Sequence, residues 1–410
     1  MPIRKRLFFS FTIRVVTAAI TAIAALCCSG GSAVLPPQPP DPALVSALSA
    51  DLTDYLAQRS TVEHISAASL SVSLPGATTN IDVTAGSAQY GGSSPVTKAS
   101  VFQVGSNTKA FTAAVILQLE AEGKLTIDQT VGHWLPQYPT WRNVTIKRLL
   151  DMTSGIATYD DTQAWQQSYS SAPTADVSPA QLVAFVDPKA PLAPGWTYSN
   201  TNYQLAAMIV ERVTGLDYAS EVYQRIITRL GLHNTYYYPS VAPTSITSRM
   251  VSGYFYSKNP SNAGLAALYG RDMRTLSLSW AGAAGGVIST PEDLTIFLRA
   301  LYQGALLAPT QRRELLSIVS DRTGMPIDST SSDDPVGFGL GVGQITSPLV
   351  DGTVWYYEGE TLGYRMTYAY FLQANVVFAV GLNSQPTSSD DNIRFLVHAI
   401  YLSLRSAGKL

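Results

Sequence analysis

The stretch Phe102-Gln-Val-Gly-Ser-Asn-Thr-Lys-Ala-Phe-Thr112 places Ser106 and Lys109 three positions apart, where an apolar run passes into a helical pattern. Residues three apart on a helix share one face, so the lysine amine is expected one turn from the serine hydroxyl. A serine hydroxyl is a weak nucleophile at neutral pH and needs a neighbouring base. The pair therefore predicts a covalent hydrolase with Ser106 as its nucleophile.

The spacing alone does not establish this chemistry. The same serine-to-lysine spacing recurs at Ser406 and Lys409, in the last residues of the chain. Short motifs carry such false positives. The alternative for Ser106 is an ordinary helix N-cap, with Lys109 as a solvated residue of the first turn. Other parts of the chain have to decide between the two interpretations.

The composition narrows the classes of function. The chain has 410 residues, of which 46% are hydrophobic and 14% charged, with a net charge of -2. This length allows two or three domains, or one large domain with an insertion. The charge gives no electrostatic footprint for nucleic acid. The four histidines do not pair at metal-ligand spacing, so neither a metal nor a cofactor is expected; they are His64, His133, His233 and His398.

The N-terminus has the pattern of a targeting segment. Basic residues at positions 4–6 precede an alanine-rich apolar run, Val15 to Cys27, that is too short to span a bilayer. We expect a signal peptide over residues 1–33 and a proline-rich linker over 34–42. Both cysteines, Cys27 and Cys28, lie in the first segment, so its removal would leave no thiol. The expected address is periplasmic or secreted, and the alternative is a lipid anchor at Cys27 or Cys28.

Hydrophobic periodicity predicts a sheet built from both ends of the chain. Helical periodicity is seen at 43–58, at 204–213, at 291–302 and in a closing helix at 391–404, whereas alternating runs at 67–74, 80–86, 340–350, 354–358, 364–372 and 376–382 predict strands. Between about 130 and 300 the pattern is mainly helical. The order predicts an antiparallel sheet with a helical region inserted between its two parts.

A second constellation could complete the chemistry of the serine. Tyr198 and Asn200 stand two apart after a rigid loop and before a helical pattern. The tyrosine could relay a proton, and the asparagine could bind a substrate carbonyl or Lys109. The alternative is a tyrosine that packs at the helix start and an asparagine that caps it. Ser257-Lys258-Asn259 is a competing match in a loop without an apolar scaffold.

Taken together, these residues resemble the penicillin-recognising serine hydrolases, which include class C β-lactamases, D-alanyl-D-alanine carboxypeptidases and related esterases. Ser106-x-x-Lys109 and Tyr198-x-Asn200 carry the resemblance. Supporting stretches are Leu149-Leu-Asp-Met-Thr-Ser-Gly155, Ala281-Gly-Ala-Ala-Gly-Gly-Val-Ile-Ser-Thr-Pro-Glu-Asp-Leu294 and Gly337-Phe-Gly-Leu-Gly341. The resemblance implies a β-lactamase/transpeptidase-like α+β fold. It implies one catalytic domain over 43–410, with sheet parts at 43–130 and 300–405 and an all-helical insertion at about 131–299.

The resemblance also implies roles for these residues. Lys109 and Tyr198 would assist an acyl-enzyme on Ser106, although which of the two is the base stays open. The oxyanion hole would use the N–H of Ser106 and that of Glu360. Asn200, Tyr357, Gly359 and Glu360 are the expected substrate-binding residues.

The chain departs from the family in its late strand. Tyr357-Glu358-Gly359 stands where the family has Lys or His, any residue, then Gly. A neutral phenol cannot attract a substrate carboxylate, although Arg365 could compensate. The departure favours esters or amides without a free carboxylate.

The resulting prediction is an extracytoplasmic serine hydrolase acting on a peptide, amide or ester. A D-peptidase, a carboxylesterase and a weak β-lactamase remain open, as does a penicillin-binding or sensor protein without turnover. We expect a small-molecule or peptide substrate, no nucleic acid, no membrane span after processing and no obligate protein partner.

Overall fold

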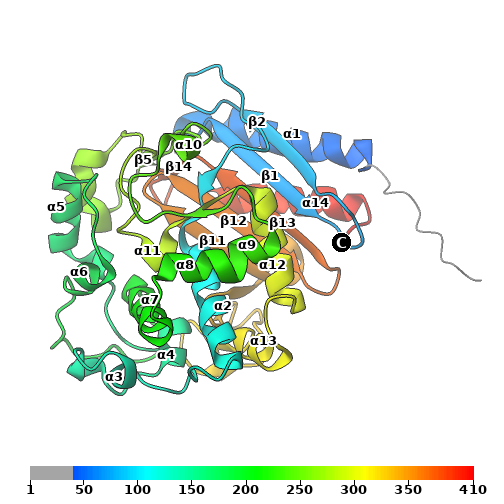
Figure 1. Ribbon diagram of the computed structural model, residues 1–410. Helices are drawn as coiled ribbons and strands as arrows, with labels where there is room; N and C mark the ends of the chain where they lie inside the picture. The colour runs from blue at the N-terminus through cyan, green and yellow to red at the C-terminus, as the bar shows by residue number, and fades with distance from the viewer. Residues whose placement is uncertain (1–39) are drawn as a thin grey trace, which may run out of the picture. The chain divides into compact units, whose positions relative to one another are not determined.

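A nine-stranded antiparallel sheet forms the centre of the computed structural model, which describes residues 40–410 (Figure 1). Its strand order is β2-β1-β13-β12-β11-β10-β9-β7-β8. Two strands precede the helical region, β1 (Ala67–Ser73) and β2 (Ile81–Gly86), and β1 pairs with β13 from the other end of the chain. The remaining strands are β7 (Ile318–Ser320), β8 (Pro326–Ile327), β9 (Val336–Phe338), β10 (Gly343–Ser347), β11 (Gly352–Thr361), β12 (Tyr364–Phe371) and β13 (Val376–Leu382). The predicted sheet from both chain ends is confirmed.

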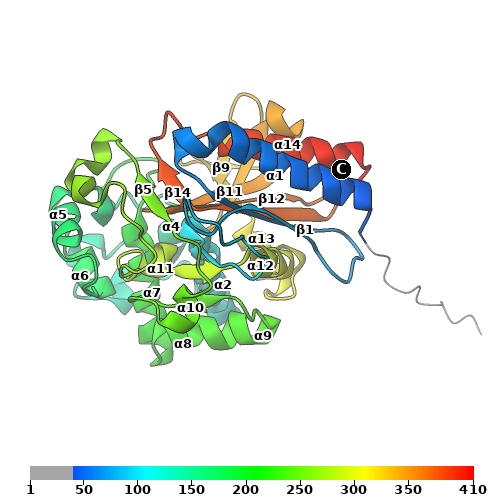
Figure 2. The same cartoon turned by 90° about the horizontal axis from the view of Figure 1, so that it is seen from above.

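Two terminal helices cover one face of this sheet. Figure 2 shows α1 (Pro42–Glu63) and α14 (Ile393–Ser406) lying side by side above the strands. Their apolar residues, Leu48 and Leu52 on α1 and Ile400 and Leu404 on α14, are fully buried against the sheet in one hydrophobic cluster. Apolar burial of this kind is the main source of their stability, because isolated helices are marginal in water.

The opposite face carries the helix that begins at the Ser-x-x-Lys stretch. A short 3₁₀ turn, Gly105–Asn107, leads into α2 (Thr108–Ala121), which is buried from Thr108 to Leu119. Phe111 of α2 stacks on Phe297 of α12 (Pro291–Gln303), with ring centroids 3.7 Å apart. A helix buried all round is a rigid support for the residues at its start.

The inserted region is mainly helical but not entirely so. Its helices are α3 (Val131–Trp134), α4 (Ile146–Leu150), α5 (Gln163–Ser171), α6 (Pro179–Val183), α7 (Asn200–Thr214), α8 (Tyr218–Val222), α9 (Thr228–Leu230), α10 (Thr244–Thr247) and α11 (Gly282–Gly285). Three short strands also lie in it. β4 (Tyr236–Tyr237) and β6 (Val287–Ser289) join β3 (Phe102–Gln103) in a small sheet, and β5 (Tyr254–Tyr256) pairs with β14 (Ser384–Pro386). The all-helical prediction is wrong in this respect, because strands of two or three residues leave no periodicity to detect.

The predicted element boundaries differ by a few residues in both parts of the chain. The strand expected at 340–350 is shorter and covers Gly343–Ser347. The helix expected at 43–58 extends over Pro42–Glu63, and Asp41, assigned to the linker, caps it by accepting a hydrogen bond from the Ala43 N–H. The predicted signal peptide and most of the linker lie outside the described residues. Among residues 40–410, none of the helices is both long enough and apolar enough to cross a membrane.

Candidate active site

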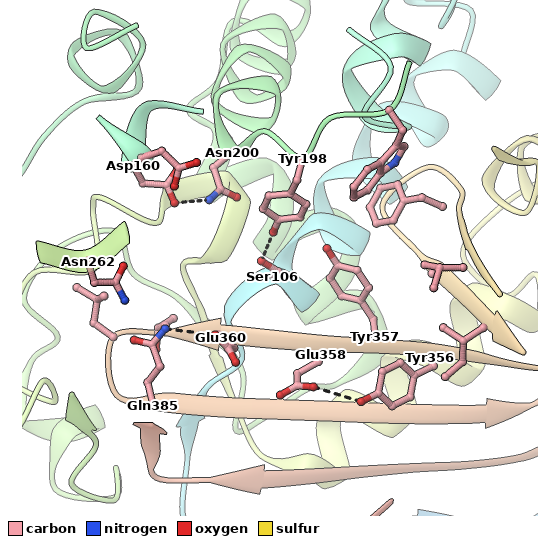
Figure 3. A pocket seen from close by; sticks show the side chains of 18 of the residues that line it. Ser106, Asp160, Tyr198, Asn200, Asn262, Tyr356, Tyr357, Glu358, Glu360 and Gln385 are labelled. Atoms are coloured by element: carbon pink, nitrogen blue, oxygen red, sulfur yellow. Dashed lines mark hydrogen bonds between the residues drawn. The ribbon is translucent and has the colours of Figure 1, made fainter. Parts of the chain in front are cut away.

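The structure places both Lys109 and Tyr198 in contact with Ser106. Figure 3 shows the contact between Ser106 and Tyr198. Lys109 Nζ donates a hydrogen bond to Ser106 Oγ at 2.9 Å, and Ser106 Oγ shares a hydrogen bond of 2.5 Å with the Tyr198 hydroxyl. The serine and lysine are held by the turn into α2, whereas the tyrosine comes from the loop before α7. The sequence places Tyr198 92 positions after Ser106, so only the fold makes this a single site.

Lys109 is completely buried beneath the serine. Its Nζ also donates to Asn200 Oδ1 at 2.7 Å and to the carbonyl oxygen of Ala284 at 2.9 Å. Burial lowers the pKa of Lys109 to about 7, against a smaller opposing effect from the charge of Asp160. Desolvation disfavours the ammonium form. The amine is therefore available as a proton acceptor near neutral pH.

Tyr198, unlike Lys109, is held in its protonated form. Burial raises the pKa of Tyr198 to about 12, although its hydrogen bond to Ser106 works against this. The phenol consequently keeps its proton at neutral pH. It is therefore better suited to donate a proton than to accept one. The lysine amine lies 4.8 Å from the centre of the Tyr198 ring.

Asn200 links the lysine to an acid that sequence reasoning missed. Its Nδ2 donates to Asp160 Oδ2 at 2.7 Å, while its Oδ1 accepts from Lys109. Asp160 follows the Leu149–Gly155 stretch in the chain, but no spacing rule connects it to Asn200. The signal available in the sequence was the polar pair Asp160-Asp161 shortly after that stretch.

Strand β11 runs directly against the turn that carries Ser106. A Cβ at Gly359 would lie 2.0 Å from the carbonyl oxygen of Val104, and one at Gly105 would lie 2.5 Å from both N and O of Glu360. Only glycines permit this approach of two backbones. The backbone of Glu360 therefore lies against Gly105, next to Ser106. The predicted oxyanion hole, made by the N–H groups of Ser106 and Glu360, requires this closeness of the two segments.

Tyr357 points into the site from the same strand (Figure 3). Its ring lies 5.6 Å from that of Phe338, and its phenol is close enough to Tyr198 to alter the pKa of that group. Tyr357 brings no positive charge to this position.

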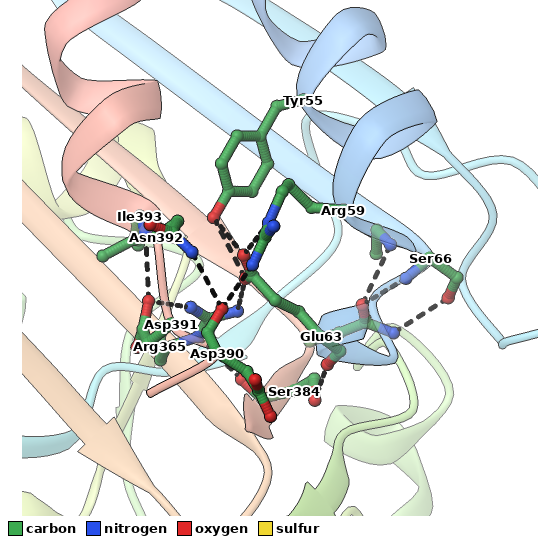
Figure 4. A network of polar contacts seen from close by, with 12 residues as sticks. Tyr55, Arg59, Glu63, Ser66, Arg365, Ser384, Asp390, Asp391, Asn392 and Ile393 are labelled. Atoms are coloured by element: carbon green, nitrogen blue, oxygen red, sulfur yellow. Dashed lines mark hydrogen bonds and ion pairs between the residues drawn. The ribbon is translucent and has the colours of Figure 1, made fainter. Parts of the chain in front are cut away.

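Arg365 does not compensate for the missing cation. It is fully buried on the other side of the sheet, where it forms ion pairs with Glu63 and Asp391 (Figure 4). Alternation along β12 sends its side chain away from Ser106. The expectation that Arg365 could attract a substrate carboxylate is therefore wrong.

The catalytic groups open into a cavity of about 650 Å³. One part of its wall is aromatic and includes Trp196, Phe338 and Tyr357. Four carboxylates also line the cavity: Asp160, Asp161, Glu358 and Glu360. Within the described part of the chain its lining holds no arginine, lysine or histidine.

Two of these acids belong to the one cluster in residues 40–410 whose ligand atoms could meet on a metal ion. Carboxylate oxygens of Glu358, Glu360 and Asp391 lie within 4.8 Å of one another. Burial, followed by the charges of Asp391 and Glu360, raises the pKa of Glu358 to about 8, and burial also raises that of Glu360. A cation placed here would relieve both effects, but Asp391 is already paired with Arg365.

Comparison with known proteins identifies the family of the chain. The family model described as Beta-lactamase matches residues 52–402. The chain belongs to the beta-lactamase family. The predictions of a β-lactamase/transpeptidase-like fold and of a hydrolase related to these enzymes are thereby confirmed, whereas the roles of single residues stay predictions.

The chain spans about half the length of the curated relatives that it matches. Penicillin-binding protein 4* of Bacillus subtilis is 29% identical over 242 residues, which are 57% of this chain and 52% of the relative. Teichoic acid D-alanine hydrolase of Staphylococcus aureus is 26% identical over 219 residues, 53% of this chain and 49% of the relative.

Two solved structures match over nearly their whole length. A D-stereospecific amidohydrolase from Streptomyces sp. is 29% identical, with a TM-score of 0.71 over 86% of this chain and 97% of that one. A D-amino acid amidase from Ochrobactrum anthropi SV3 has a TM-score of 0.72 over 89% of this chain and 99% of that one. At 22% identity this second likeness shows the fold alone.

Proposed function

We propose that this chain is an extracytoplasmic hydrolase that forms an acyl-enzyme on Ser106 and acts on esters or amides without a free carboxylate. The observation that carries the proposal is the contact of Ser106 Oγ with both a buried lysine amine and a phenol, at 2.9 and 2.5 Å. A hydroxyl held between a base and a proton donor is equipped for acyl transfer.

In the first step, neutral Lys109 takes the proton of Ser106 as Oγ forms a bond to the substrate carbonyl carbon. The carbonyl oxygen becomes an oxyanion held by the N–H groups of Ser106 and Glu360, each worth about 3 kcal/mol of transition-state stabilisation. Tyr198 then gives its proton to the leaving group as the bond to that group breaks, and the proton that Lys109 took from Ser106 returns to the phenolate, so that both groups regain their starting forms. In the second half of the reaction, water attacks the acyl carbon in place of Ser106. The bond to Ser106 Oγ then breaks, the serine regains its proton and the carboxylic acid product is released.

The uncharged Tyr357 and the four acids of the cavity support the substrate class. A substrate carboxylate would meet four negative or potentially negative groups and no cation in the cavity lining, taken over the described residues. Such like-charge contacts oppose binding. The likeness to a D-stereospecific amidohydrolase supports amides as substrates, and D-configured substrates in particular.

Labelling of the nucleophile tests the proposal. A fluorophosphonate should raise the mass of the protein by one adduct, attached to Ser106. Ser106→Ala should not be labelled, and its kcat for ester hydrolysis should be lower by at least about 1,000-fold. Absence of label from the folded wild-type protein would contradict the acyl-enzyme. A penicillin adduct that forms without turnover would instead indicate a penicillin-binding protein.

Paired substrates test the role of Tyr357. Neutral p-nitrophenyl esters should be hydrolysed with a higher kcat/KM than acyl-D-Ala-D-Ala peptides, because the peptides present a carboxylate. Efficient release of D-alanine from these peptides would show that this substrate class is wrong.

The proposed extracytoplasmic location is supported by the basic residues at positions 4–6 and the apolar run that ends at Cys27. Cell fractionation of the full chain with an epitope at its C-terminus would test export, and labelling with a fatty-acid analogue would test an anchor at Cys27 or Cys28.

A further inference from the structure

A continuous row of aromatic rings lines the cavity beside Ser106. The ring of Trp196 lies 6.3 Å from that of Tyr198 and 5.8 Å from that of Phe338, between centroids. Phe338 in turn lies 5.6 Å from Tyr357. We call Trp196, Phe338 and Tyr357 the aromatic wall, since all three line the cavity. Because these rings pack on one another, the wall is formed before a substrate arrives, which lowers the cost of binding.

The aromatic wall is well supported and continues toward the surface. A Cβ on Gly324 would lie 2.8 Å from the backbone N of Trp196, so the loop at 321–325 packs closely on the loop that carries the indole. Val336 stands two positions before Phe338 on β9, lines the cavity and is 38% exposed. Residues two apart on a strand share a face. The apolar surface therefore extends from Phe338 to the solvent.

The aromatic wall presents mainly carbon surface to a ligand. The indole Nε1 of Trp196 is buried, and the phenol of Tyr357 lies close enough to that of Tyr198 to alter its pKa. The carboxylate of Asp160 and the amide of Asn200 lie on the other side of Tyr198 from Tyr357 (Figure 3). A charged or strongly hydrated group placed against the wall would lose water without gaining a partner.

Tyr198 indicates which half of a substrate meets the aromatic wall. Its hydroxyl contacts Ser106 Oγ at 2.5 Å and is the proposed proton donor. When the bond from the acyl carbon to the leaving oxygen or nitrogen breaks, that atom has to lie within hydrogen-bond reach of this hydroxyl. Trp196 and Tyr357 are the wall residues next to Tyr198. The leaving group is thus the half that extends along the wall.

We propose that the aromatic wall is a subsite for the leaving group, so that the alcohol or amine released by this enzyme carries an aromatic ring or an alkyl chain. The inference rests on the proposed acyl-enzyme at Ser106 and goes further than the absence of a carboxylate. Rings of a ligand pack on aromatic side chains in stacked or edge-on contacts, and burial of apolar surface favours binding. The residues assigned to this specificity are Trp196, Phe338 and Tyr357.

Two isomeric esters test the assignment. Benzyl acetate carries its ring on the leaving alcohol, whereas methyl phenylacetate carries the same ring on the acyl group. The two leaving alcohols have nearly equal acidity, so their chemical reactivity is matched. The wild-type enzyme should show a kcat/KM for benzyl acetate that is higher by about tenfold or more, because removing one aromatic ring from water favours binding by at least that factor.

A variant of the wall locates this preference. Phe338→Ala removes one ring of the wall, and the ratio of the two kcat/KM values should fall toward one. General damage to the fold would lower both values alike and leave their ratio in place. Phe395→Ala makes the same change at a residue that is 50% exposed on α14, which covers the sheet face away from the site, and should keep the wild-type ratio.

The outcomes separate this inference from the proposed function. A ratio of one or below in the wild-type enzyme overturns the leaving-group subsite, and the acyl-enzyme stands if a fluorophosphonate still labels Ser106. This comparison needs no variant, so it holds even if Phe338→Ala does not fold. An unchanged ratio in folded Phe338→Ala also overturns the subsite, because the preference would then arise elsewhere. Absence of label at Ser106 would instead remove the proposed function and the inference with it.

Discussion

At the scale of single residues, the burial of Lys109 decides whether Ser106 can react. Its amine has no carboxylate in direct contact, since Asn200 stands between it and Asp160. Desolvation therefore outweighs attraction, and the pKa of Lys109 falls to about 7. The same lysine on a solvated first turn would be charged at neutral pH and useless as a base.

The pH dependence of acylation should report this lysine. Since the lowered pKa makes the amine neutral above about pH 7, kcat/KM should rise through an apparent pKa near 7. Asp160→Asn removes the charge that raises the pKa of Lys109, so the rise should move to lower pH. An unmoved or upward-shifted profile would contradict this origin. Asp54→Asn, on the exposed surface of α1, should leave the profile in place.

At the scale of elements, the site depends on the contact of strand β11 with the turn before α2. The strand supplies Tyr357 through a side chain and Glu360 through its backbone N–H. Gly359 and Gly105 set the distance between the two backbones. Gly359 thus belongs to the motif that resembles the family, and it is also needed for the close packing of β11 against the turn before α2.

Gly359→Ala should impair both stability and activity. Its Cβ would lie 2.0 Å from the Val104 carbonyl oxygen, so β11 must move, at a cost of about 1–3 kcal/mol for overpacking. A displacement of about 1 Å at the oxyanion hole can lower kcat by roughly 100-fold. Urea unfolding and ester kinetics check both effects. Thr353→Ala, at an exposed position of the same strand, should change each only slightly, and wild-type activity in Gly359→Ala would refute the role of this contact.

At the scale of the whole described unit, Arg365 ties the two ends of the chain together. It reaches from β12 to Glu63 at the end of α1 and to Asp391 before α14, and it donates through Nε to the Ser384 carbonyl oxygen at 2.9 Å (Figure 4). Tyr55 adds a hydrogen bond to Glu63 at 2.9 Å. These contacts fix the helical layer that covers the sheet face away from the site.

Arg365→Met should destabilise the protein by about 3–5 kcal/mol, because it leaves Glu63 buried without one of its partners. Urea unfolding measures this loss. In Arg365→Met combined with Glu63→Met the loss should be clearly smaller than the sum of the two single losses, since neither Glu63 nor Arg365 is then left buried without the other. Strictly additive losses would mean that the two residues are not coupled.

The class of the protein and most of its helices and strands are predictable from the amino-acid order alone. Alternating runs and helical periodicity located the strands of both chain ends and the terminal helices, because these patterns reflect burial of one face within a single element. Ser106-x-x-Lys109 and Tyr198-x-Asn200 are likewise local patterns, and the family comparison agrees with the hydrolase class that they indicated.

The chemistry of the site, in contrast, follows from how distant segments pack together. The desolvation of Lys109, the link from Asn200 to Asp160 and the engagement of Arg365 by Glu63 each depend on segments tens to hundreds of residues apart. The strands of two or three residues were missed for the same reason, since long-range pairing rather than periodicity defines them. A pKa and an ion pair are properties of surroundings in space, and the order of residues along the chain does not state them.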